Sequence, residues 1–150
     1  MGDIPKGIES GFVATLFASL LLLVQQMSGI APDFTLITWI NWAADTYSQP
    51  YMGWVLHFII GAGLFGAGFA VFSPHLYGPH WVRGLTFGFG TWFLMMTAFM
   101  SAANLPMFAM GMGLSIPIFA LVLNISFGLV LGETYHLLLH YLPSEVDENA

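Results

Sequence analysis

The chain has 150 residues, of which 57% are hydrophobic and 7% are charged, with a formal net charge of −6 and no cysteine. A soluble domain carries roughly 25% charged residues, so this chain lacks the polar surface that a water-soluble enzyme or a disordered protein needs. Its two basic residues are too few for a nucleic-acid binder. The lack of cysteine excludes disulfides, iron–sulfur clusters and thiolate metal sites. The composition therefore indicates an integral membrane protein.

Four segments are long and apolar enough to cross a bilayer, which takes about 20 residues. The sequence predicts spans at about 10–29, 51–72, 84–103 and 115–141. The first could be a secretory signal, but acidic residues accompany Lys6 and no small-residue cleavage site follows, so we interpret it as a membrane helix. The apolar runs are continuous, without the alternation of a barrel. The predicted fold is therefore one all-α integral membrane domain with four transmembrane helices.

A break and a short aromatic-rich stretch separate the first two spans. Pro32 and Asp33 interrupt the chain, and Asp33 could cap a helix. The large apolar residues that follow are Phe34, Ile37, Trp39, Ile40 and Trp42. This pattern predicts a short helix lying in the membrane interface, where aromatic rings sit at headgroup level. The alternative is an aromatic-rich loop.

The basic residues indicate how the chain is oriented. Lys6 precedes the first span, and Arg83 lies between the second and third. Because cytoplasmic loops are enriched in lysine and arginine, we expect both termini in the cytoplasm, in a bacterial inner membrane. Tryptophan and tyrosine gather near the predicted span ends, as interfacial belts do, with Trp92 as the exception.

The second and fourth spans share a pattern that indicates an internal repeat. Residues 55–64 read VLHFIIGAGL and residues 122–131 read VLNISFGLVL, so that His57 matches Asn124 at a constant offset. The first and third spans match loosely, mainly through Gly11 and Gly84. This predicts a helical hairpin duplicated in one orientation. The alternative is chance similarity between apolar helices.

Small residues recur at helical spacing along the spans. In hydrocarbon, glycine lets two helix backbones approach closely while polar side chains bond across the gap. We therefore predict packing faces, within the bundle or toward a partner, at Gly61, Gly66, Gly84, Gly88, Asn124, Gly128 and Gly132.

His57 lies inside the second span, and an intramembrane histidine is a candidate functional residue. One interpretation is a neutral imidazole that hydrogen-bonds between helices, with Asn124 as its partner; we favour it. The other is a haem or metal ligand. A b-type haem needs two axial ligands at one depth, and the sequence offers only His57 with Met100.

At the end of the fourth span, Glu133, His136 and His140 are three and four residues apart, which places them on one helix face. Together with His75 and His80 they could bind a divalent metal. The alternative, which we favour, is a polar helix end where the glutamate pairs with the arginine of the second loop. The E-x-x-H element occurs once, which argues against a di-iron bundle.

Methionines gather in the half of the chain expected to face outward. Thioethers suit Cu(I), so the 104–113 loop could handle copper. Methionine also fills irregular gaps between helices, and we favour that interpretation. The residues are Met27, Met52, Met95, Met96, Met100, Met107, Met110 and Met112.

Three motifs carry a resemblance to a family. They are W-V-L-H-F-x-I-G at 54–61, R-G-L-T-F-G-F-G-T-W-F-L-M-M at 83–96 and P-x-F-x-L-V-L-N-x-x-F-G-x-x-L-G-x-x-Y at 117–135. From about residue 11 to 139 the chain resembles a family of small uncharacterised four-span bacterial membrane proteins. Its members often carry histidine where this chain has Asn124. The resemblance implies the four-span architecture and supplies no activity.

These observations predict a non-catalytic integral membrane subunit that packs against lipid and against other membrane subunits or itself, in a complex that could serve respiration or electron transfer. One alternative is a copper- or haem b-handling protein that uses His57 with the methionines, or Glu133 with His136 and His140. Another is a small oligomeric channel or transporter. No nucleophile–base pair or phosphate loop stands out, so neither an enzyme active site nor a nucleic-acid partner is expected.

Overall fold

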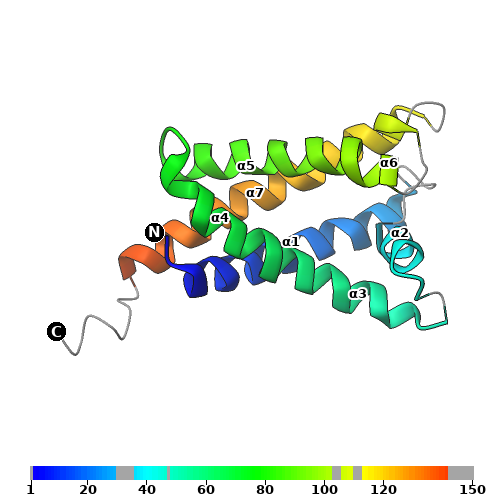
Figure 1. Ribbon diagram of the computed structural model, residues 1–150, viewed down its shortest axis with the longest axis horizontal. Coiled ribbons are helices and arrows are strands. Elements are labelled where there is room, and N and C mark those ends of the chain that lie inside the picture. Colours follow the sequence, from blue (N-terminus) through cyan, green and yellow to red (C-terminus); the bar gives the residue numbers. More distant parts are fainter. Residues whose placement is uncertain (1, 30–35, 47, 103–105, 110–112, 142–150) are drawn as a thin grey trace.

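The computed structural model describes residues 2–29, 36–46, 48–102, 106–109 and 113–141, and the described residues form helices and no strand. The long helical segments run alongside one another in an elongated bundle (Figure 1). The all-α prediction is confirmed. Among the described residues, the helices long and apolar enough to cross a membrane are Ile4–Ser28, Pro50–His75 and Ser115–Tyr141.

Helix α1, Ile4–Ser28, begins earlier than the predicted start at about residue 10. The Asp3 side chain caps it by accepting a hydrogen bond of 3.1 Å from the backbone N–H of Lys6, and a proline occupies its first turn. The helix ends at Gly29, whose φ of 69° is left-handed and suits glycine. The cap, and not the apolar run, therefore sets the first helical residue.

The second predicted span, 51–72, corresponds to a composite segment that we call helix two. Its parts are α3 (Pro50–Phe58), the π-helical stretch η1 (Ile59–Gly66), α4 (Ala67–Phe72) and the 3₁₀ turn η2 (Ser73–His75). The apolar helix is confirmed, but the π-helical stretch was not predicted. Such stretches are rare and frequently occur at functional sites.

The third predicted span falls in a second composite segment, which we call helix three. Its parts are α5 (His80–Leu94), the π-helical stretch η3 (Met95–Phe99) and α6 (Met100–Ala102). It is continuously helical over 80–102 but is not among the helices that meet the length and apolarity criteria for a span.

Helix α7, Ser115–Tyr141, has the bounds that the sequence predicts for the fourth span. Helix α2, Leu36–Ala43, is the short helix expected between the first two spans. It is a helix and not a loop, while its position in a membrane interface stays a prediction. A short 3₁₀ turn, η4 (Met107–Ala109), precedes α7. Asp33, the predicted cap of the short helix, lies outside the described residues.

The bundle consists of two closely packed helix pairs. In the first pair α1 packs along helix two, and in the second pair helix three packs along α7. The two pairs meet through α1 and α7, which occupy the centre (Figure 1). Helices two and three flank this centre and meet mainly where η2 leads into α5.

Glycines bring the backbones of each pair together. A Cβ atom at Gly84 would meet the carbonyl oxygen of Gly128, and a Cβ at Gly11 would lie 2.8 Å from the carbonyl oxygen of Ala62. The predicted packing residues Gly61, Gly66, Gly84, Gly88, Asn124, Gly128 and Gly132 all contact a neighbouring helix of their own pair.

Candidate functional site: a central cavity

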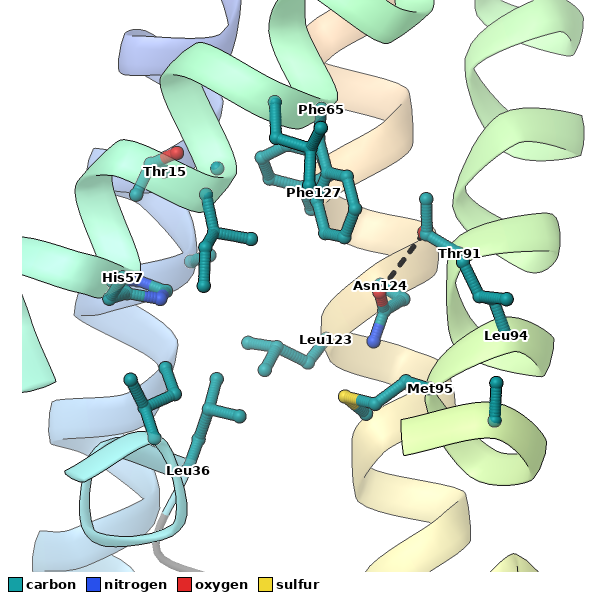
Figure 2. A pocket seen from close by; sticks show the side chains of 16 residues that line it. Thr15, Leu36, His57, Phe65, Thr91, Leu94, Met95, Leu123, Asn124 and Phe127 are labelled. Atoms are coloured by element: carbon teal, nitrogen blue, oxygen red, sulfur yellow. Dashed lines mark hydrogen bonds between the residues drawn. The ribbon is translucent and has the colours of Figure 1, made fainter. Parts of the chain in front are cut away.

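A cavity of about 500 Å³ lies between the two helix pairs. Its walls come from α1, α2, helix two, helix three and α7, so that both pairs contribute (Figure 2). The wall is mainly apolar. The polar side chains in it are Thr15, His57, Thr91 and Asn124. A mostly apolar cavity with a few polar groups is the usual form of a small-molecule site.

His57, on the last turn of α3, supplies the unusual polar group. Its side chain is 8% exposed, and its Nε2 atom is buried with no hydrogen-bond partner. Edge-on aromatic contacts fix the imidazole, with ring centroids 6.0 Å from Trp54 and 5.7 Å from Phe58. Figure 2 shows the ring turned toward the space between the pairs. A buried polar atom without a partner is rare and needs an explanation.

Asn124, on α7, lies on the cavity wall opposite His57, and its side-chain amide forms hydrogen bonds within the second helix pair. Its Nδ2 donates to the Ala120 carbonyl at 2.8 Å, and its Oδ1 accepts from the Thr91 hydroxyl at 3.1 Å. Figure 2 shows this second bond across helix three and α7. The hydrogen bond that the sequence suggested between His57 and Asn124 is absent, and Asn124 bonds to Thr91 on the adjacent helix and to Ala120 on its own helix.

A second cavity of about 420 Å³ adjoins the first. Its walls come from helix two, from Leu76 just after it, and from α5. The two cavities share Leu64, Phe65, Thr91 and Leu94. Leu64 and Leu94 are 66% and 57% exposed, so the shared wall reaches the outer surface. We call the second cavity the lateral groove.

The predicted haem ligand Met100 is fully buried at the start of α6, but it does not line the cavity that His57 lines. Met95, in the π-helical stretch η3, does line it. The structure therefore does not bring His57 and Met100 to one cavity wall. Met110 and Met112, which belong to the predicted copper loop, lie outside the described residues.

The histidines of the predicted metal site gather at the other end of the bundle. The ring centroids of His80 and His136 are 4.7 Å apart, and those of His136 and His140 are 4.1 Å apart. His140 Nδ1 lies 2.9 Å from the carbonyl oxygen of His136. Within the described ranges, no group of three or more His, Asp and Glu residues is arranged to hold a metal ion. A metal site at Glu133, His136 and His140 stays a prediction.

We call His80, His136 and His140 the histidine cluster, and Arg83 and Glu133 lie near it. The predicted ion pair of Glu133 is absent from the part of the chain that the structure describes, because the Arg83 Nε donates to the Gly78 carbonyl at 2.8 Å. Partial burial lowers the pKa of His80 below its ordinary value, and the nearby cationic groups His136, Arg83 and His140 lower it further, against the opposing effect of Glu133.

Three parts of the central site were not predicted from the sequence. They are the cavity, the role of Thr91 as the partner of Asn124, and the π-helical stretches that form part of the wall. A signal for Thr91 exists: it follows Gly88 by one helical turn on the face that packs against α7.

Comparison with known proteins places the chain in a family without assigning an activity. No curated protein and no solved structure matches it significantly. The model of a family of unknown function, DUF6789, matches residues 1–145, which is nearly the whole chain. This agrees with the resemblance of the motifs to a small uncharacterised family. The chain therefore belongs to the DUF6789 family of unknown function.

Proposed function

We propose that the protein is a four-span integral membrane protein that holds a lipid-soluble molecule in its central cavity. The observation that carries this proposal is the buried His57 Nε2, which lacks a partner at the wall of a cavity of about 500 Å³. Leaving such an atom unsatisfied costs about 1–3 kcal/mol. A ligand that pairs with Nε2 removes this cost, whereas an empty apolar cavity does not.

The outer surface of helix three supports a fourth span. Helix three runs beside α7 along the bundle (Figure 1). Phe89 and Phe93 are each 51% exposed and Leu94 is 57% exposed. Large apolar side chains on an outward face match the hydrocarbon of a bilayer. The first turn of α1 contains Lys6 and the first turn of α5 contains Arg83. Both helix starts lie against the C-terminal half of α7, so the positive-inside rule would place that end of the bundle in the cytoplasm of a bacterial inner membrane.

The packing of the two pairs supports a duplicated hairpin. When Gly11 is matched with Gly84, and Gly61 with Gly128, the same backbone contact occurs twice. A Cβ at Gly11 would lie 2.9 Å from the carbonyl oxygen of Gly61, and a Cβ at Gly84 would meet the carbonyl oxygen of Gly128. Parallel repeats place matched positions around a common centre. The matched histidine and asparagine both line the cavity, as this arrangement requires.

Extraction of the purified protein tests the proposal. The protein would be purified in mild detergent, extracted with organic solvent and analysed by mass spectrometry, together with His57→Phe and the matched control His75→Phe, which changes an exposed histidine outside the cavity. We expect a near-stoichiometric lipid-soluble compound with the wild type and the control, and a marked loss with His57→Phe. Only bulk phospholipid, in equal amounts from all three proteins, would refute ligand binding.

A second candidate function is that of an accessory subunit in a larger membrane complex, such as a respiratory one. Gly63 favours it, because a Cβ at this position would have no neighbour within 4 Å and the residue lines neither cavity. Small residues on an outer face let a partner helix approach. Cross-linking and native gel electrophoresis of membranes test this, with Gly63→Leu expected to weaken association. A single monomer band before any substitution would count against it.

The other two functions considered from the sequence also stay proposals. Copper or haem b at His57 would appear as bound metal or as a Soret absorption band in the purified protein, and neither should survive His57→Phe. A channel or transporter would give solute flux into liposomes that depends on the protein. The structure gives haem b less support than ligand binding, since the predicted second ligand Met100 does not line the cavity that His57 lines.

A further inference from the structure

We propose that the molecule in the central cavity is a quinone-class lipid, that is, a neutral ring with two opposed oxygen atoms and a long apolar tail. This inference rests on the proposed function and names its ligand. Four features of the cavity bear on it: charge, the position of the polar groups, the aromatic wall and the lateral groove.

Charge excludes ionised lipids from the cavity. Among the described residues that line it, none is acidic or basic apart from the imidazole of His57. A carboxylate, phosphate or ammonium group would be buried there without a counter-ion, and the loss of its hydration would strongly oppose binding. The occupant is therefore neutral, which separates it from fatty acids and from the headgroups of phospholipids.

The polar groups lie on opposite walls. His57 Nε2 is on the first pair, and the Asn124 amide is on the second (Figure 2). Nε2 donates or accepts according to the tautomer of the ring. Asn124 keeps one amide hydrogen beyond its bond to Ala120, and its Oδ1 keeps a lone pair beyond its bond to Thr91. Both sites can thus pair with a quinone carbonyl or with a quinol hydroxyl.

The aromatic wall and the lateral groove fit the ring and the tail. Phe65 and Phe127 line the cavity as an edge-to-face pair with ring centroids 6.1 Å apart, which offers flat surface to a planar ring. The groove of about 420 Å³ continues outward past Leu64 and Leu94. An apolar tail can leave by this route toward the surrounding lipid.

Binding of a decyl-substituted benzoquinone to the protein in lipid nanodiscs tests this inference. The signal is quenching of tryptophan fluorescence, and loss of the response in Trp54→Phe assigns it to the residue whose ring lies 6.0 Å from His57. We expect saturable binding by the wild type. Affinity should fall about tenfold or more in His57→Phe and stay unchanged in His75→Phe.

A second pair of variants tests the route of the tail. Leu64→Trp narrows the passage that joins the cavity to the lateral groove, whereas Leu129→Trp adds the same bulk to the outer face of α7, away from both. We expect weaker binding with Leu64→Trp only. If gel filtration and thermal unfolding show that His57→Phe does not fold, the comparison of Leu64→Trp with Leu129→Trp still tests the inference.

Each outcome has a defined meaning. Linear quenching, equal in the wild type, His57→Phe and Leu64→Trp, would show partition into lipid and would overturn the inference. If benzoquinone fails to saturate while extraction yields a different neutral lipid, the quinone assignment falls and the proposed function stands. If neither experiment finds a bound molecule, both the quinone assignment and the proposed function are refuted.

Discussion

The two helix pairs differ in how they treat the polar residue that each turns toward the cavity. In the second pair, Asn124 forms hydrogen bonds to Ala120 and Thr91, so both polar atoms of its amide have partners within helix three and α7. In the first pair, His57 Nε2 is buried at the same cavity without a partner. Since both pairs use glycine contacts between their backbones, this contrast separates a polar group whose hydrogen bonds come from its own helix pair from one that the protein leaves without a partner.

The largest effect is expected from breaking the backbone contact of the second pair. Gly128→Leu places a side chain where the Gly84 carbonyl and the Gly88 backbone lie, so helix three and α7 must separate. We expect a loss of about 3 kcal/mol in the free energy of unfolding, measured by thermal unfolding in nanodiscs. The control is Gly63→Leu, whose Cβ has no neighbour within 4 Å. Equal melting temperatures for the two variants would contradict the close contact.

A smaller loss is expected when the satisfied polar group is removed. Asn124→Leu deletes the bonds to Ala120 and Thr91, although the Thr91 hydroxyl keeps the Gly88 carbonyl at 2.9 Å. We expect destabilisation by about 1–2 kcal/mol. The measurement is the free energy of unfolding of folded protein from which any bound ligand has been removed. A variant as stable as the wild type would remove the structural role assigned to this amide.

His57→Phe should behave in the opposite way in ligand-free protein. Replacing the imidazole, whose buried Nε2 has no partner, by an apolar ring of similar size is expected to leave the free energy of unfolding unchanged or to raise it. The same unfolding assay measures this. With ligand bound, the wild type gains stability that the variant cannot gain. Strong destabilisation without ligand would show that His57 has a protein partner, and the contrast between the pairs would disappear.

The smallest effect concerns the histidine cluster at the other end of the bundle. The pKa of His80 lies below its ordinary value of about 6.5, so the folded state binds its proton less readily than the unfolded state. Stability is therefore full above pH 6.5 and declines as the pH falls through the lowered pKa. Titration of the imidazole by NMR should show the shift. His136→Asn should raise the pKa of His80 toward 6.5, and an unchanged value would show that the neighbouring imidazole has no influence.

Local sequence was enough to find the long apolar helices, but not their interruptions. The 115–141 segment is a continuous apolar run, and the structure has a helix with these bounds. The matched positions of His57 and Asn124 placed both residues near one level, and both line one cavity. The predicted hydrogen bond between them was wrong. Asn124 bonds instead to Thr91 of α5, a helix that the comparison of the second and fourth spans does not include. Cavity size likewise depends on the distances between helices, which no single segment encodes.

The π-helical stretch Ile59–Gly66 changes which residues of helix two share a side. Gly61 contacts Thr15 and Gly66 contacts Gly7, so two glycines five residues apart both face α1. In a regular α-helix, residues five apart point about 140° away from each other. The π-helical turns are wider than α-helical turns, so they accommodate one additional residue and keep both glycines on the side that faces α1. Deleting Gly63, whose Cβ position is empty, would bring the glycines to four-residue spacing, at which an ordinary α-helix turns both of them toward α1.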